Sequence, residues 1–393
     1  MMTRLNVLFL ASWYPNELNP QNGNFIQRHA EAVSKFCNVF VIHVRARNQQ
    51  KKYVCEKRPN KNVKEFICWY SKHSSNIPVF SYLKKINRKI KAYKFAFEEV
   101  SKITQTIDIV HVNVILPAGI FALFLKKKHK IPFIITEHWT KFQNTASESF
   151  SFLEQYFIKK ISAQASAVCP VSENLKNALI DFGIKSNFKV IPNVVNTKIF
   201  YTDTSVKNTN KVKLLHISHL DDKHKNISGI LNVIKRLSDK RNDFHITVSG
   251  NRNIEKHKMY AEKIGVSQNV LTFESEKTSE EVADAMRQHD LFVMFSNYEN
   301  LPCVISESHV CGIPVISSDV GGVSEMINKE NGILCEAGNE DSLYQKLTKI
   351  IDNIENYSSN IISEKAQAKY SYVVVGKQFF KLYNDVLQKQ ITS

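Results

Sequence analysis

Residues 299–307 read ENLPCVISE, and residues 308–325 continue as SHVCGIPVISSDVGGVSE. Asn300 is a good helix N-cap, a proline follows in what would be the first turn, and Gly312 is typical of a helix end. This spacing predicts a helix over residues 301–311. The stretch decides the fold class, because the helix directly follows an apolar run and precedes another one, as in a strand–helix–strand unit.

Two acids flank the start of this predicted helix. Glu299 lies just before it, and Glu307 lies between one and two turns into it. A helix that follows a parallel strand turns its N-terminal N–H groups toward the carboxyl edge of the sheet, where ligands of open α/β sheets bind. Carboxylates accept hydrogen bonds from hydroxyl groups. The stretch therefore predicts a site for a ligand that carries both an anion and hydroxyls.

Short apolar runs recur along the rest of the chain in two series. Most are continuous rather than alternating, which is typical of strands that are covered on both faces. Helix-length amphipathic segments separate them, and together they predict an α/β fold with two Rossmann-like, doubly wound parallel-sheet domains. The runs are residues 5–12, 38–44, 108–113, 132–137 and 166–172, then 213–218, 244–250, 269–275, 291–296, 313–318 and 332–336.

A polar, Asn- and Thr-rich segment at residues 193–211 separates the two series. It predicts an N-terminal domain over residues 1–195 and a C-terminal domain over 196–372. The last helix, about residues 373–393, is expected to pack back onto the N-terminal domain. The two domains are expected to face each other across a cleft, with ligands at their strand ends.

The 393 residues carry a formal charge of +16, with 53 Lys and Arg against 37 Asp and Glu. This excess predicts an anionic partner, such as a nucleotide or an anionic membrane surface. No helix-turn-helix, zinc-finger or RNP-like motif accompanies the charge, so nucleic acid is not an expected partner.

The cysteines and the N-terminus indicate a reducing, cytoplasmic location. The seven cysteines form no C-x-x-C pair, and we expect reduced thiols rather than disulfides or a zinc site. The short apolar run near the start is interpreted as the first buried strand, not as a secretory signal. No apolar run approaches the roughly 18 residues that span a bilayer.

Glu299 and Glu307, together with the following CGIPVISSDVGGVSEMI, resemble the signature of the family 4 retaining glycosyltransferases, which have the GT-B fold. The resemblance implies that Glu307 holds the ribose hydroxyls of a nucleotide-sugar donor and that Glu299 lies beside the donor sugar. It also implies that the helix start carries the diphosphate; this start comprises Asn300, Leu301, Pro302 and Cys303.

Residues 216–231, HISHLDDKHKNISGIL, resemble the family segment that usually reads Gly-Arg-Leu, then Lys-Gly. Lys225 matches the phosphate-binding lysine, and the resemblance makes it catalytic together with Glu299. His219 stands where the family usually has arginine, with one extra residue before Lys225. Three interpretations stay open: His219 is a weaker donor, Lys223 supplies the missing charge, or the alignment slips.

The first half of the chain carries two further matches. Gly23 lies in a loop between the first strand and a helix, where the family's glycine loop approaches the donor phosphate and the acceptor. His138, in TEHWTKF, matches a strand-end histidine near the reacting carbon. The resemblance therefore assigns acceptor binding to the N-terminal domain and donor binding to the C-terminal one.

No Asp-x-Asp occurs in the chain, so no donor-bound metal and no cofactor is implied. Lys225 and the backbone N–H groups of the helix start are expected to neutralise the leaving diphosphate. The resemblance implies retention at the anomeric carbon.

Residues 82–97, YLKKINRKIKAYKFAF, combine one apolar helical stripe with many lysines. Two interpretations remain open: a basic helix on an anionic membrane, or a helix that packs on the first sheet with solvated lysines. A membrane position would suit a lipid-linked acceptor and would make the protein peripheral on the cytoplasmic membrane face.

The sequence thus predicts a metal-independent, retaining glycosyltransferase that moves a sugar from a nucleotide-sugar donor to a glycan or lipid-linked acceptor, in surface polysaccharide biosynthesis. The alternatives are another GT-B enzyme, namely a sugar-nucleotide epimerase or a phosphorylase, and a non-catalytic glycan- or membrane-binding relative.

Overall fold

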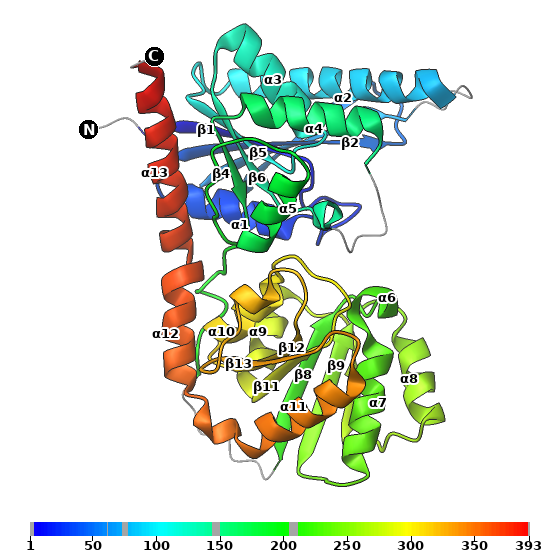
Figure 1. Cartoon of the computed structure of the whole chain (residues 1–393). Coiled ribbons are helices and arrows are strands. Elements are labelled where there is room, and N and C mark those ends of the chain that lie inside the picture. Colours follow the sequence, from blue (N-terminus) through cyan, green and yellow to red (C-terminus); the bar gives the residue numbers. More distant parts are fainter. Residues whose placement is uncertain (1–3, 61, 73–77, 144–149, 204–210, 392–393) are drawn as a thin grey trace. The chain divides into compact units, whose positions relative to one another are not determined.

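The computed structural model describes residues 4–60, 62–72, 78–143, 150–203 and 211–391 (Figure 1). The chain divides into two compact units, here called the N-terminal unit (Met1–Val194 with Tyr372–Ser393) and the C-terminal unit (Val195–Ser371). Each unit encloses a hydrophobic core of its own.

In its described residues, the N-terminal unit forms a seven-stranded sheet in the order β3-β4-β2-β1-β5-β6-β7. All neighbouring strands run parallel except the edge pair β3 and β4. Val7 to Ala11 of the central strand are fully buried because helices cover both faces. The strands are β1 Asn6–Ala11, β2 Asn38–Arg47, β3 Tyr53–Asn60, β4 Val63–Ser71, β5 Ile109–Asn113, β6 Phe133–Glu137 and β7 Ala167–Pro170.

The helices of this unit include the C-terminal one, which packs beside α1 (Figure 1). Gly376 makes that approach possible, because a Cβ there would lie 2.4 Å from the carbonyl oxygen of Ala32. Val375, Phe379 and Tyr383 of the same helix are fully buried in the core. The helices are α1 Asn24–Val33, α2 Pro78–Ser101, α3 Ala118–His129, the 3-10 turn η1 Thr140–Phe142, α4 Phe152–Gln164, α5 Glu173–Asp181 and α13 Tyr372–Ile391.

The described part of the C-terminal unit contains a six-stranded parallel sheet in the order β10-β9-β8-β11-β12-β13. Counted along the chain this is 3-2-1-4-5-6, the Rossmann order, with its switch point between β8 and β11. The strands are β8 Val212–Ser218, β9 Phe244–Gly250, β10 Leu271–Glu274, β11 Leu291–Met294, β12 Val315–Ser318 and β13 Gly332–Cys335. The helices are α6 Asp222–Lys225, α7 Ile227–Ser238, α8 Ile254–Lys263, α9 Ser279–Gln288, α10 Cys303–Val310, η2 Val323–Glu325, α11 Glu340–Asp352, η3 Ile354–Asn356 and α12 Ser359–Tyr370.

The expectation that every cysteine is reduced is wrong for one pair. Cys55 and Cys68 face each other in the antiparallel β3–β4 ladder, with their Cα atoms 4.1 Å apart, and form a disulfide. No sequence pattern predicts this disulfide, because only the hairpin register brings the two residues together. Among the five free cysteines, Cys303 is partly buried and the other four are buried.

The described part of α2 packs on β2 and β4. This agrees with the interpretation that the helix packs on the first sheet. Tyr93 and Ala96 are buried against the sheet, whereas Lys91 and Lys94 are exposed. The predicted stripe begins at Tyr82, and the side chains before Ile86 lie outside the described ones. In the part of the chain that the structure describes, no helix is long and apolar enough to cross a membrane. The membrane interpretation of this helix stays a prediction.

Candidate active site

The loop between β11 and α10 carries the predicted glutamates, and both are buried. Glu299 is 6% exposed and Glu307 is 7% exposed. The predicted helix start is wrong by two residues, because α10 begins at Cys303. Pro302 is its N-cap, with the extended backbone angles φ −67° and ψ 121°, and gives no side-chain cap. Asn300 is therefore not the cap; its carbonyl accepts a hydrogen bond from Gly322 N–H at 2.8 Å.

The end of α10 follows the prediction. Gly312 comes after the C-cap and has φ 79°, which few residues other than glycine adopt readily. Its N–H donates to the carbonyl of His309 at 2.9 Å, and the next N–H, of Ile313, donates to that of Ser308 at 3.1 Å. A Cβ at Gly312 would lie 2.7 Å from the Ser359 carbonyl oxygen, so the turn needs glycine for space as well.

Lys225 and Glu299 form a buried ion pair at the carboxyl edge of the sheet. The Lys225 ammonium donates to Oε1 of Glu299, and the Ser296 hydroxyl donates to the same oxygen at 2.8 Å. The two side chains are 14% and 7% exposed. Burial alone would raise the pKa of Glu299, but Lys225, His224 and the two hydrogen bonds outweigh it and lower that pKa. The carboxylate is therefore ionised at neutral pH.

Hydrogen bonds at the switch point join β8 to β11. His216 of β8 bridges to β11, with Nδ1 at 2.8 Å from the Val293 carbonyl oxygen and Nε2 at 2.8 Å from Ser218 Oγ. Burial lowers the pKa of His216 to about 4, so the ring is neutral at pH 7. Gly250 ends β9 beside this point, where a Cβ would lie 2.1 Å from the Ser218 carbonyl oxygen.

His219 does not join the Lys225–Glu299 pair. Its side chain is exposed, and Nδ1 lies 3.2 Å from Oδ1 of Asn251. Lys223, the other candidate for the missing charge, is also exposed. The residue that sequence reasoning missed is His224, whose Nε2 lies 3.9 Å from Oε1 of Glu299. Its position next to Lys225, for which the resemblance implies phosphate binding, was the available signal.

In the N-terminal unit, Gly23 has φ 72° and ψ 25° and is the N-cap of α1. A Cβ there would lie 2.6 Å and 2.7 Å from the carbonyl carbon and oxygen of Trp13, and 2.8 Å from the Tyr14 nitrogen. The loop after β1 therefore requires glycine at this position for two reasons: the positive φ, and the close approach of the chain to the backbone of Trp13. The prediction that Gly23 lies in a tight loop between strand and helix is confirmed, while its contact with a ligand stays a prediction.

His138 follows β6 and is 8% exposed. Its ring lies 4.6 Å from that of Phe25 on α1 and 5.5 Å from that of His29. Burial, reinforced by His29 and His111, holds the pKa of His138 well below its usual value. The ring is thus a neutral imidazole at pH 7.

Glu137 fixes the backbone around this histidine. Its carboxylate accepts hydrogen bonds from the N–H groups of Ile115 (2.9 Å), His138 (2.8 Å) and Trp139 (2.9 Å). Burial raises the pKa of Glu137 to about 7, although the three hydrogen bonds act in the opposite direction. The strand end and the loop after β5 are therefore joined through one fully buried side chain.

Two further observations concern other kinds of site. In the described residues, no group of three or more His, Cys, Asp or Glu side chains could hold a metal ion; metal independence stays a prediction.

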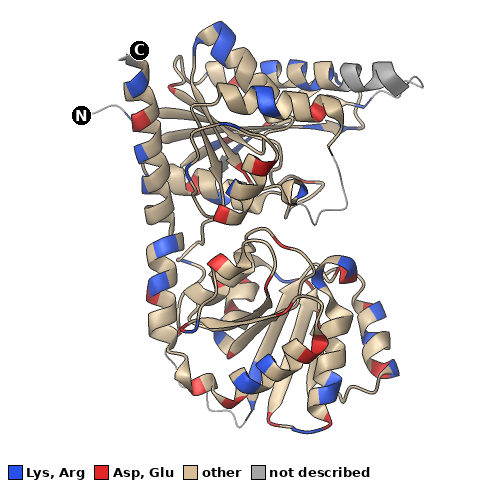
Figure 2. Ribbon diagram, viewed as in Figure 1, with Lys and Arg blue, Asp and Glu red and all other residues tan. Residues whose placement is uncertain are grey.

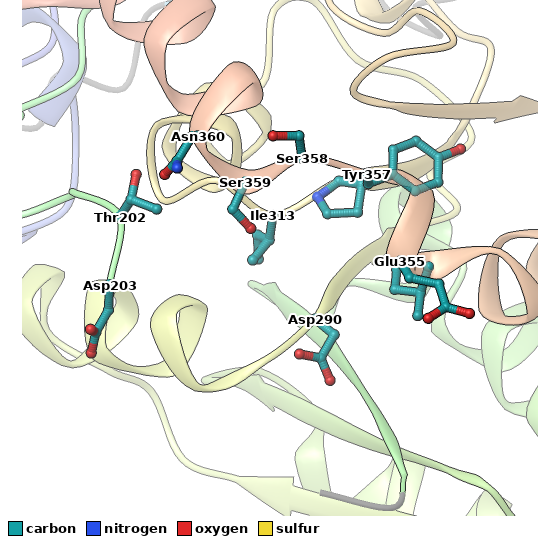
Figure 3. A pocket seen from close by; sticks show the side chains of 11 residues that line it. Thr202, Asp203, Asp290, Ile313, Glu355, Tyr357, Ser358, Ser359 and Asn360 are labelled. Carbon is teal, nitrogen blue, oxygen red and sulfur yellow. The ribbon is translucent and has the colours of Figure 1, made fainter. Parts of the chain in front are cut away.

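A cavity of about 450 Å³ lies where β11 and β12 begin, at the edge of the sheet opposite the two glutamates (Figure 3). The Asp290 carboxylate in its wall accepts a hydrogen bond from the backbone N–H of Lys213 at 2.9 Å, and this bond joins the start of β11 to β8.

Comparison with known proteins bears on both units. The model of "Glycosyltransferase Family 4" matches residues 24–199, and that of "Glycosyl transferases group 1" matches residues 198–369. The chain belongs to the family 4 glycosyltransferases. An uncharacterised glycosyltransferase of Methanocaldococcus jannaschii is 29% identical to it over 71% of this chain and 75% of that protein. A putative teichuronic acid biosynthesis glycosyltransferase of Bacillus subtilis is 22% identical over 88% of this chain and 89% of its own.

Solved structures of glycosyltransferases share the fold of this one. Sucrose-phosphate synthase of Thermosynechococcus elongatus has a TM-score of 0.77 at 16% identity, covering 98% of this chain and 100% of its own. HepE of Anabaena, solved in complex with UDP and glucose, has a TM-score of 0.68 at 16% identity, covering 97% and 100%. The predicted GT-B architecture of two Rossmann-like α/β domains is confirmed.

Proposed function

We propose that this glycosyltransferase transfers a sugar from a nucleotide-sugar donor, with retention at the anomeric carbon and without a metal ion. The observation that carries the proposal is the buried Lys225–Glu299 ion pair at the carboxyl edge of the C-terminal sheet, beside the helix that bears Glu307. HepE, which shares the fold, was solved with UDP and glucose, and this supports a uridine nucleotide as the first donor to test.

The diphosphate is proposed to bind Lys225 and the start of α10, at Asn300, Leu301, Pro302 and Cys303. Lys225 is a partly dehydrated cation, 14% exposed, so its attraction for phosphate is screened less than that of a surface lysine. The positive end of the helix dipole adds to this attraction. Together they would stabilise the charge that develops on the leaving diphosphate.

The two glutamates are proposed to bind hydroxyl groups of the donor. Glu307 lies on α10, more than one turn from its start, where it would accept hydrogen bonds from the ribose hydroxyls. Glu299 is held ionised by Lys225, so it would accept hydrogen bonds from the donor sugar. On the resemblance, the leaving phosphate itself takes the proton of the acceptor hydroxyl, on the face from which the diphosphate departs.

His138 and Gly23 are proposed to act from the N-terminal unit. A neutral imidazole both donates and accepts one hydrogen bond, so His138 would orient sugar hydroxyls without adding charge. Gly23 would bring the backbone of its loop close to the donor phosphate and the acceptor.

We further propose that the acceptor is a glycan or a lipid-linked sugar of a surface polysaccharide. The Bacillus subtilis relative, whose name refers to teichuronic acid biosynthesis, supports this class. The formal charge of +16 suits work at the anionic cytoplasmic face of a membrane. In Figure 2, Lys and Arg occur on the described part of α2 and on other helices of both units, so the charge is not confined to one element.

The first prediction concerns nucleotide binding. In a metal-free thermal-shift screen with UDP, GDP, ADP and CMP, we expect one nucleotide to raise Tm. At 100 times Kd the stabilisation is about 2.7 kcal/mol. Lys225→Ala and Glu307→Ala should each reduce the shift strongly, because they remove the phosphate and ribose contacts.

Lys346→Ala, on α11 of the same unit, is the matched control and should keep the full shift. A shift that appears only with Mg²⁺ would contradict metal independence. A protein that shows no shift with any of the four nucleotides would contradict donor binding and support the non-catalytic alternative.

A further inference from the structure

His224 lies where two elements of the proposed donor site meet, the short helix α6 with Lys225 and the loop after β11 with Glu299. It is the residue before Lys225 on α6. Asn297, in the loop after β11, makes two hydrogen bonds to this helix: its N–H donates to the His224 carbonyl at 2.9 Å, and its side-chain amide donates to the Lys223 carbonyl at 3.0 Å. The loop and the helix therefore hold their side chains in a constant arrangement.

The imidazole of His224 stacks on the ring of Tyr298, with centroids 4.2 Å apart and planes 9° from parallel. Its Nε2 is buried and has no hydrogen-bond partner among the described residues. This nitrogen lies 3.9 Å from Oε1 of Glu299, which is too far for a hydrogen bond. The same oxygen already accepts from Lys225 and Ser296. A buried polar atom without a partner is costly, so it calls for an explanation.

Four groups face the ring and determine its charge. Burial acts most strongly and lowers the pKa of His224, and the Lys225 ammonium lowers it further. The Glu299 carboxylate, a hydrogen bond to the Tyr298 backbone and Asp221 raise it, but less. His224 is therefore neutral at pH 7 as long as the Lys225 ammonium stays on Glu299.

We propose that His224 is a positioning residue that replaces Lys225 as the cationic partner of Glu299 when the donor binds. The proposal rests on the proposed function, in which Lys225 binds the donor diphosphate. As the ammonium turns toward phosphate, Glu299 loses part of its neutralising charge and new negative charge arrives. Both changes favour the imidazolium form, so Nε2 takes up one proton from water or buffer acid and donates it in a hydrogen bond to Glu299.

This exchange would keep Glu299 buried, ionised and oriented toward the donor sugar throughout binding. It also gives the Nε2 atom the partner that it lacks in the free protein. His219 is unsuited to the role, because its exposed ring lies against Asn251.

The first test needs no ligand. The imidazole signals of the free protein are followed by NMR against pH, and His224→Gln identifies the signal of His224. Lys225→Met imitates the loss of the ammonium, and we expect it to raise the pKa of His224 by about one unit or more. In Lys225→Met with Glu299→Gln the pKa should fall back, because the attracting carboxylate is gone. An unchanged pKa in Lys225→Met would overturn the proposal, and an unshifted signal of His309, on which Lys225 does not act, checks that the variant is folded.

The second test measures proton uptake on binding of UDP-glucose at pH 7, by calorimetry in two buffers with different ionisation enthalpies. UDP-glucose has no titrating group of its own near this pH. The wild type should take up roughly half a proton to one proton per molecule bound. His224→Gln should bind without this uptake, since its amide donates to Glu299 without titrating.

His245→Gln, on β9, is the matched control and should take up as many protons as the wild type. Equal uptake by His224→Gln and the wild type would overturn the proposal. Failure of UDP-glucose to bind the wild type would contradict the proposed donor instead, and the ligand-free titration would then decide the role of His224 by itself.

Discussion

At the scale of single residues, the charge of the site is concentrated on one carboxylate oxygen. Oε1 of Glu299 accepts hydrogen bonds from Lys225 and Ser296, and Nε2 of His224 lies 3.9 Å from the same oxygen. A buried ion pair of this kind contributes little to stability, because dehydrating both charges costs about as much as their attraction returns. Its position is therefore better explained by what it binds than by what it stabilises.

A second prediction concerns the glycine loop. Gly23→Ala should destabilise the N-terminal unit by about 2 kcal/mol or more, because a Cβ meets the backbone of Trp13 in addition to the unfavourable φ of 72°. Transferase activity should fall with it, since the loop must move. The unfolding free energy is measured in urea.

Gly183→Ala is the matched control in the same unit. Its φ is 92°, but an added Cβ meets only the flexible end of the Lys159 side chain, at 3.1 Å. It should cost about 1 kcal/mol, the backbone contribution alone. Equal losses in the two variants would show that the close approach at Trp13 does not matter.

The site residues that could be predicted are those with a recognisable local pattern. Lys225 and Glu299 were assigned on such patterns, and they meet although 74 residues separate them. His224 could not be found in this way, because its stacking on Tyr298 arises from the docking of a loop on a helix. The exposure of His219 likewise depends on the path of the chain after β8.

At the scale of elements, apolar runs predicted all parallel strands but one, because strands covered on both faces must be apolar throughout. The β3–β4 hairpin was missed. β3 lies at the sheet edge and reads YVCEKRPN, with three charged residues in a row rather than an apolar run. β4 buries Glu65, which accepts hydrogen bonds from Tyr14 (2.8 Å) and Gln27 (3.0 Å). Glu65 can be buried because it has hydrogen-bond partners, and two of them, Tyr14 and Gln27, lie 51 and 38 residues away in the sequence.

A third prediction tests the contact of α13 with α1. An alanine is normally better than glycine inside a helix, by about 1 kcal/mol. Gly376→Ala should instead destabilise the protein by about 2–3 kcal/mol, because the Cβ would lie 2.4 Å from the Ala32 carbonyl oxygen and the helices would have to separate. Chemical denaturation of the wild type and the variant measures whether the free energy of unfolding falls or rises.

Gln378→Ala, exposed on the same helix, is the control for this prediction and should change stability by no more than about 0.5 kcal/mol. A stabilised Gly376→Ala variant would mean that α13 does not approach α1 as closely as the structure shows.

At the scale of the whole molecule, buried histidines link stability to pH in both units. Burial lowers the pKa to about 4 for His29 and His43 in the N-terminal unit and for His216 and His309 in the C-terminal unit. In the unfolded chain each has a pKa of about 6.5, so the unfolded state binds more protons between those values. The stability that they contribute is complete above pH 6.5 and is lost as the pH falls toward 4.

Glu137 acts in the opposite direction, since burial raises its folded pKa to about 7 from the ordinary value of 4.5. The folded state holds its proton in this interval, so its contribution to stability grows as the pH falls from 7. It opposes these four histidines, and buried His111 and His138, whose pKa values also lie well below the usual one, act in the same direction as the four. We therefore expect a net loss of stability on acidification through this range.

The last prediction isolates one of the four histidines. His43 hydrogen-bonds through Nδ1 to the Ala11 carbonyl oxygen at 2.9 Å, and Arg45 and Lys89 add to the effect of burial on its pKa. His43→Gln should reduce the slope of unfolding free energy against pH by about 1.4 kcal/mol per pH unit near pH 5.5, which corresponds to one proton. His129→Gln, exposed at the end of α3, should leave the slope unchanged. Urea unfolding of all three proteins at pH 5, 6, 7 and 8 measures these slopes. A His43→Gln slope equal to that of the wild type would mean that this ring is protonated in the folded protein, and hence that β2 packs less tightly against β1 than the structure shows.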